Sequence, residues 1–156
     1  MTSSTMTATA PSASSAATDA APQDATQAGD TRPARVTLLV CTTCREADGS
    51  DARPRPGERL LAATEAANDG SAEVAGVECL GNCKRRLSAG FIAEGGWTYV
   101  FGDLTEDNAA DLIEGARLLS EARGGVMPWR GRPQCLKSGM VSRIPPLPGI
   151  TKRSDR

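Results

Sequence analysis

Apolar positions change their spacing along the chain, and each spacing predicts a different element. Residues 35–40 read RVTLLV, a short apolar run typical of a strand buried on both faces. Residues 56–69 are rich in helix formers and stop before Gly70, where a helix can end. Residues 72–79 form a second apolar run. A strand, a helix and a strand within this length predict a parallel β-α-β unit.

From residue 87 the apolar spacing shortens to two. Residues 87–93 and 97–101 place apolar side chains at alternate positions, with Gly95 and Gly96 between the two runs, which predicts a β-hairpin. Residues 105–123 begin with Thr105 as a cap and carry apolar side chains at helical spacing. The order β-α-β-β-β-α is that of the smallest thioredoxin-like folds. We therefore expect an α/β domain with a thioredoxin-like fold over residues 35–123.

The N-terminal segment differs sharply in composition from this domain. Residues 1–34 contain no Leu, Ile, Val or aromatic residue, so they cannot bury enough apolar surface to offset the entropy of ordering. We expect a disordered tail. It has no basic start followed by an apolar core, and no window of the chain approaches the length of a membrane span. We therefore expect a cytoplasmic protein, in which thiols stay reduced and structural disulfides are rare.

The C-terminal segment is strongly basic. Residues 123–156 hold eight basic residues and one acidic residue, a net charge of +7, whereas the whole chain carries −1. The sequence RIPPLPG at 143–149 favours an extended chain, because proline restricts its own backbone and that of the preceding residue. Residues 124–156 are therefore expected to form an irregular extension, either a solvated tail or a patch that docks on an acidic partner. The total charge gives no sign of a nucleic-acid or membrane partner.

Two pairs of cysteines follow the two predicted parallel strands. Cys41 and Cys44 come after the first, and Cys79 and Cys83 after the second. Since the carboxyl ends of parallel strands meet at one edge of a sheet, four sulfurs can converge there, where open α/β sheets place ligands. The chain has no histidine, so a metal would be held by soft thiolates, which favour zinc or iron–sulfur over magnesium or calcium. These four cysteines are the predicted ligands.

The spacing leaves alternatives open. Between Cys44 and Cys79 lie 34 residues, more than the about 12 to 20 that separate zinc-ribbon knuckles. The cations of residues 84–86 would stabilise an anionic cluster, although they also suit a solvated turn. One rival is a structural or carrier zinc module, and another is a thioredoxin-type dithiol at the first pair. Cys135 matches no motif. No catalytic constellation is present, so we do not expect an enzyme.

Several short segments carry a resemblance to known proteins. CLGNC followed by basic residues is similar to the second cysteine pair of thioredoxin-like 2Fe–2S ferredoxins and of a small complex I subunit. Together, LLVCTTCR, CLGNCKR, WTYVFGDL and MPWRGRP with RIPPLP resemble a bacterial family of predicted metal-binding, ferredoxin-like proteins, across about residues 36–148. The resemblance implies a 2Fe–2S cluster on the four cysteines, a redox protein partner and a link to cobalamin metabolism. Here the first pair is closer together than in those ferredoxins.

Overall fold

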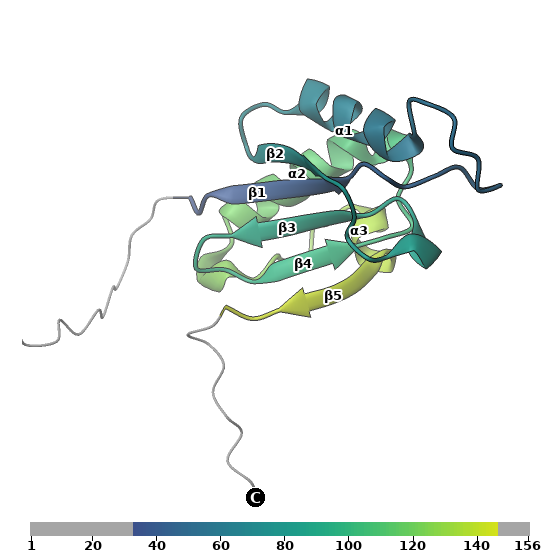
Figure 1. Cartoon of the computed structure of the whole chain (residues 1–156). Coiled ribbons are helices and arrows are strands. Elements are labelled where there is room, and N and C mark those ends of the chain that lie inside the picture. Colours follow the sequence, from purple (N-terminus) through teal and green to yellow (C-terminus); the bar gives the residue numbers. More distant parts are fainter. Residues whose placement is uncertain (1–32, 147–156) are drawn as a thin grey trace, which may run out of the picture. The chain divides into compact units, whose positions relative to one another are not determined.

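The protein folds around one mixed β-sheet, shown in Figure 1. The computed structural model describes residues 33–146. The sheet has the strand order β2-β1-β3-β4-β5. Only β1 and β2 run parallel, and every other neighbouring pair is antiparallel. The strands are β1 (Val36–Cys41), β2 (Glu73–Val77), β3 (Ala89–Ala93), β4 (Thr98–Phe101) and β5 (Met140–Ile144).

Two longer helices and one short helix accompany the sheet. They are α1 (Pro56–Ala67), α2 (Ala109–Ser120) and α3 (Gln134–Ser138). Pro56 suits the first position of α1 because it has no backbone N–H to leave unpaired, and the Glu58 carboxylate accepts the Arg55 N–H at 2.7 Å. Since α1 and α2 contact each other and both contact β1, they cover the same face of the sheet.

The hydrophobic core lies between the sheet and these helices. Alternate residues of β1 point into it, and Leu38 and Val40 are fully buried, as are Phe91, Tyr99 and Phe101 from β3 and β4. Burying one such side chain contributes roughly 1.5–3 kcal/mol, so this layer supplies much of the driving force for folding. From the helices come the buried residues Leu60, Leu112, Leu119 and Leu136.

Every strand and helix that the sequence predicts between residues 35 and 123 is present, with small changes at the ends. The second strand ends at Val77, two residues before Cys79. The sheet, however, has one strand more than predicted.

The expectation that residues 124–156 are irregular is wrong for part of that segment. Residues 134–138 form α3, and residues 140–144 form β5, which pairs with β4 along its length. The physical reason is burial: Met127 and Leu136 belong to the hydrophobic core, and the Arg132 side chain is also buried. The compact unit therefore continues beyond residue 123.

The remaining tail expectations lie outside the described residues. The predicted disorder of residues 1–34 falls almost wholly on residues 1–32, and the end of the basic extension falls on residues 147–156. Within residues 33–146, no helix combines the length and the apolar character needed to cross a bilayer.

Candidate metal-binding site

The first cysteine pair sits at the carboxyl end of β1, next to the start of α1. Cys41 is the last residue of that strand, and both Cys41 and Cys44 are buried, with 4% and 7% of their surface exposed. A side chain at Gly57 would collide with the Cys41 carbonyl oxygen. Glycine at this position therefore lets the helix start approach the cysteine loop closely.

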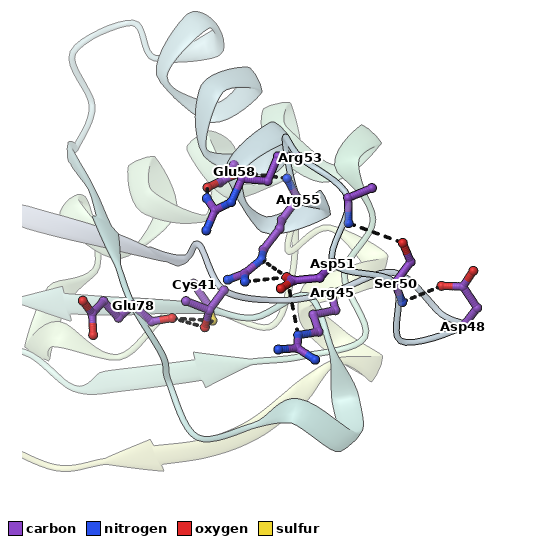
Figure 2. Close-up of polar contacts among 11 residues, drawn as sticks. Cys41, Arg45, Asp48, Ser50, Asp51, Arg53, Arg55, Glu58 and Glu78 are labelled. Atoms are coloured by element: carbon purple, nitrogen blue, oxygen red, sulfur yellow. Dashed lines mark hydrogen bonds and ion pairs between the residues drawn. The ribbon is translucent and has the colours of Figure 1, made fainter.

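The first loop is joined to the start of the second by hydrogen bonds. The Val77 carbonyl accepts from the Thr42 N–H at 2.8 Å and from the Thr42 hydroxyl at 3.0 Å. The Glu78 carbonyl accepts from the Thr43 N–H at 3.3 Å, from the Thr43 hydroxyl, and from the Cys41 thiol at 3.6 Å. Figure 2 shows the contact between Cys41 and Glu78. The parallel pairing of β1 and β2 thus continues into both cysteine loops.

The loop that follows Cys44 is held by charged residues (Figure 2). Asp51 lies between two arginines, accepting a hydrogen bond from Arg55 Nε at 2.6 Å and lying 3.7 Å from Arg45 Nε. Arg53 pairs with Glu58 on the first turn of α1. These ion pairs are largely exposed, so each is worth little alone. Together they order a loop that contains no strand or helix.

The second cysteine pair is more accessible than the first. Cys79 and Cys83 are both exposed. Gly81, between them, has a φ of +72°, a backbone conformation that glycine adopts easily. Its N–H donates to Cys79 Sγ over 3.2 Å. Backbone N–H donors to sulfur stabilise a thiolate and tune the potential of iron–sulfur centres.

Arg85 fastens this second loop to the C-terminal segment. Cys83 begins the short 3-10 helix η1 (Cys83–Arg85). Arg85 Nε donates to Asp103 at 2.7 Å. Its two terminal nitrogens donate to the Met140 carbonyl at 3.2 Å and the Ser138 carbonyl at 3.4 Å. The last residue of α3 and the first residue of β5 are thus bonded to Arg85, two positions after Cys83. The sequence pattern does not indicate this connection.

Asn82 and Gly102 complete the support of η1. The Asn82 amide donates to the Arg85 carbonyl and to the Ser88 hydroxyl, each at 3.1 Å. A side chain at Gly102 would collide with the Asn82 amide and with the Arg85 carbonyl. The end of β4 therefore packs directly against the second cysteine loop.

All four predicted cysteines line one open pocket of about 680 Å³. Arg45, Arg55 and Arg86 also line it. Of the three consecutive cations at 84–86, only Arg86 reaches the pocket wall, since Arg85 is engaged by Asp103. Glu46 is the one carboxylate among the lining residues, so the pocket combines thiols with an excess of positive charge.

The two buried thiols influence each other. The neighbouring Cys44 thiol lowers the pKa of Cys41 to about 5, and Cys41, together with burial, raises the pKa of Cys44. The neighbouring Cys44 thiol therefore favours the thiolate form of Cys41. A thiolate is the form that binds metal or attacks a disulfide.

The four cysteine side chains line the pocket but are not arranged as a preformed metal site. Within residues 33–146, no three Cys, Asp or Glu side chains are close enough together to hold a metal ion. Their chemistry nevertheless fits a thiophilic metal, because the donors are all sulfur and the two exposed thiols are uncovered. Their role as ligands stays a prediction.

Cys135 lies apart from this pocket. Its thiol donates to the Asp111 carboxylate at 3.4 Å, and burial together with that carboxylate raises the pKa of Cys135 to about 12. The thiol form of Cys135 is therefore favoured at neutral pH.

Comparison with known proteins gives one match. A model of a protein family of unknown function, DUF1636, matches residues 38–146. The chain belongs to this family. The DUF1636 match begins in β1 and ends just after β5, so it includes both cysteine loops and the C-terminal elements. No curated protein and no solved structure matches the chain significantly.

Proposed function

We propose that this protein is a ferredoxin-like one-electron carrier with a 2Fe–2S cluster held by Cys41, Cys44, Cys79 and Cys83. One observation carries the proposal: two loops that leave neighbouring parallel strands contribute all four thiols to one pocket. A two-cysteine contribution from each loop is the donor pattern that the sequence resemblance implies.

The arrangement of the domain supports a thioredoxin-like ferredoxin fold. The strand order β2-β1-β3-β4, with only the first two parallel, follows from the element order expected for that fold. Helices α1 and α2 share one face of the sheet. β5 is an additional strand at the edge of the sheet opposite β2, so it does not lie beside β1 or β2, the strands that lead into the cysteine loops.

The surrounding residues have distinct parts in this proposal. A bound 2Fe–2S cluster would supply reversible one-electron transfer at the four thiols. Burial of Cys41 and Cys44 shields one side of the site from water, whereas the exposed Cys79 and Cys83 leave the other side open to a redox protein. An all-cysteine donor set predicts a low reduction potential, near the about −400 mV of plant-type ferredoxins. The pocket cation Arg86 would raise it, because the reduced state is more negative.

A dithiol oxidoreductase at Cys41 and Cys44 is the second candidate. The low pKa of Cys41, caused mainly by the neighbouring Cys44 thiol, favours it. Two features count against it. Both sulfurs are buried, which hinders attack on a protein disulfide, and this candidate gives no role to Cys79 and Cys83, which line the same pocket. A zinc carrier or structural zinc module would use the same four thiols.

The test replaces each cysteine by serine in turn and measures the iron and zinc bound to anaerobically purified protein. The proposal expects each of Cys41, Cys44, Cys79 and Cys83 to be required for full iron content, and Cys135→Ser to bind like the wild type. Full iron occupancy after the loss of any one of the four would remove that residue from the ligand set. One equivalent of bound zinc without iron would support a zinc carrier or structural zinc module instead.

A disulfide-reduction assay separates the carrier from the dithiol enzyme. With all four thiolates engaged, the metal-loaded protein should reduce insulin disulfides no faster than dithiothreitol alone. A catalytic rate that Cys41→Ser abolishes and Cys79→Ser leaves unchanged would establish the dithiol reading instead.

A further inference from the structure

The C-terminal segment carries positive charge that nothing in the described structure neutralises. Residues 123–146 contain five basic residues and no Asp or Glu. None of the five takes part in an ion pair within residues 33–146, whereas six arginines elsewhere in that range do. The five are Arg123, Arg130, Arg132, Lys137 and Arg143.

Three of these cations stack on the two tryptophans of the chain. Arg143 lies 5.2 Å from the centre of the Trp97 ring, and Arg132 and Lys137 lie 5.3 Å and 5.9 Å from the centre of the Trp129 ring. Arg132 also lies near enough to Arg143 for the two charges to repel. These three cations and two tryptophans form what we call the aromatic–cationic patch: Trp97, Trp129, Arg132, Lys137 and Arg143. They come from β5, from α3, from the segment before α3 and from the turn before β4.

Apolar surface is concentrated in the same segment. Of the five large apolar side chains that are exposed within residues 33–146, four lie between residues 126 and 144. Trp129 is the most exposed of them, at 61%. Exposed tryptophan and arginine together are typical of the energetic centre of a protein–protein interface. β5 is also an edge strand, with one side unpaired among the described strands.

Arg132 is a buried cation in the same segment. Its side chain is only 5% exposed, and it donates to the Pro128 and Met127 carbonyls. Its Nη1 has no hydrogen-bond partner in the described structure. A buried guanidinium without a carboxylate lacks the compensation that such groups normally have. The Arg132 guanidinium therefore adds uncompensated positive charge beneath the more exposed cations Lys137 and Arg143.

We propose that the aromatic–cationic patch is a docking surface for an acidic protein segment, one that presents carboxylates beside apolar side chains. Carboxylates would pair with Lys137 and Arg143, and the apolar side chains would cover Trp129. Cations that already lie over aromatic rings are held in place, so binding would cost little side-chain entropy. The proposal uses no cysteine, and its success or failure is independent of the metal site.

The experiment measures binding of a fluorescein-labelled peptide in which glutamates flank a central pair of leucines, with the full-length protein. The same peptide with every Glu replaced by Gln reports the contribution of charge. Lys137→Gln/Arg143→Gln and Trp129→Ala test the patch. The matched control is Arg35→Gln/Lys84→Gln, which removes two exposed cations outside the patch that form no ion pair within residues 33–146.

We expect the acidic peptide to bind more weakly to both patch variants, by about tenfold for the double variant, and to lose affinity at high salt. The control should stay within about twofold of the wild type, since long-range charge alone has a small effect in salt. Equal losses in the patch variant and the control, or equal binding of the Glu and Gln peptides, would overturn the proposal. Binding to phosphatidylserine vesicles that requires the patch, without binding to the peptide, would overturn it in favour of a lipid surface.

Discussion

Replacing Arg85 with alanine removes the link between the second cysteine loop and the α3–β5 junction. The change deletes an ion pair with Asp103 and two hydrogen bonds to backbone carbonyls. The ion pair is exposed and contributes about 0.2–1 kcal/mol. The two carbonyl bonds, at 3.2 Å and 3.4 Å, are long and partly exposed, so each falls at the lower end of the usual range of about 0.5–1.5 kcal/mol. The free energy of unfolding should fall by about 1–2 kcal/mol.

The same substitution should weaken metal binding. Loss of a residue that orients a ligand typically costs about 10–100-fold in affinity, and Arg85 stands two positions from Cys83. Urea denaturation of the metal-free protein measures the first effect. Titration with Co²⁺, whose charge-transfer absorption reports thiolate ligation, measures the second. Lys84→Ala is the matched control, because Lys84 is an exposed neighbour without an ion pair among the described residues.

The outcomes separate three situations. Lower stability with weaker Co²⁺ binding in Arg85→Ala, and neither change in Lys84→Ala, would support the link. Unchanged stability and unchanged Co²⁺ affinity in Arg85→Ala would refute the reasoning. If Co²⁺ binds neither wild type nor variants through thiolate, the metal proposal itself fails, whatever the stability shows.

Three further predictions concern other contacts. Gly102→Ala should destabilise the fold by about 1–3 kcal/mol in urea denaturation, because its Cβ would collide with the Arg85 carbonyl; Gly90→Ala, where the nearest atoms stand at ordinary contact distance, should have a much smaller effect. Deleting residues 142–156 removes most of β5 and should lower the thermal unfolding midpoint by several degrees, whereas ending the chain at residue 146 keeps every described element. Cys135, with its pKa raised to about 12, should react with iodoacetamide at pH 8 at least about a hundredfold more slowly than free cysteine, as followed by mass spectrometry. Its rate should keep rising with pH beyond 9, and Asp111→Asn should lower that pKa; a rate that levels off near pH 9 would contradict this.

The local pattern of the sequence is sufficient for the main elements and for the gathering of the cysteines. Period-two alternation predicts β3 and β4, and the apolar runs predict β1 and β2. Parallel pairing then brings Cys41, Cys44, Cys79 and Cys83 to one pocket. These inferences succeed because the spacing of apolar residues along each element indicates which of its faces is buried.

The C-terminal elements could not be found in the same way. α3 has five residues and β5 has five, too few to show a period, and prolines and basic residues surround them. Their stability comes from long-range contacts: Leu136 in the core and the pairing of β5 with β4. Arg85 illustrates the same limit. In the sequence it is one of three equivalent cations, and only the fold distinguishes it from Arg86, which lines the pocket.

The central claim is that four cysteine thiolates hold a 2Fe–2S cluster that carries one electron. The most direct test is electron paramagnetic resonance of anaerobically purified full-length protein before and after reduction with dithionite, with iron and acid-labile sulfide measured on the same sample. We expect brown protein with equal amounts of iron and sulfide, no paramagnetic signal when oxidised, and the signal of one unpaired electron per cluster when reduced. Colourless protein without labile sulfide, and without a signal after reduction, would contradict it.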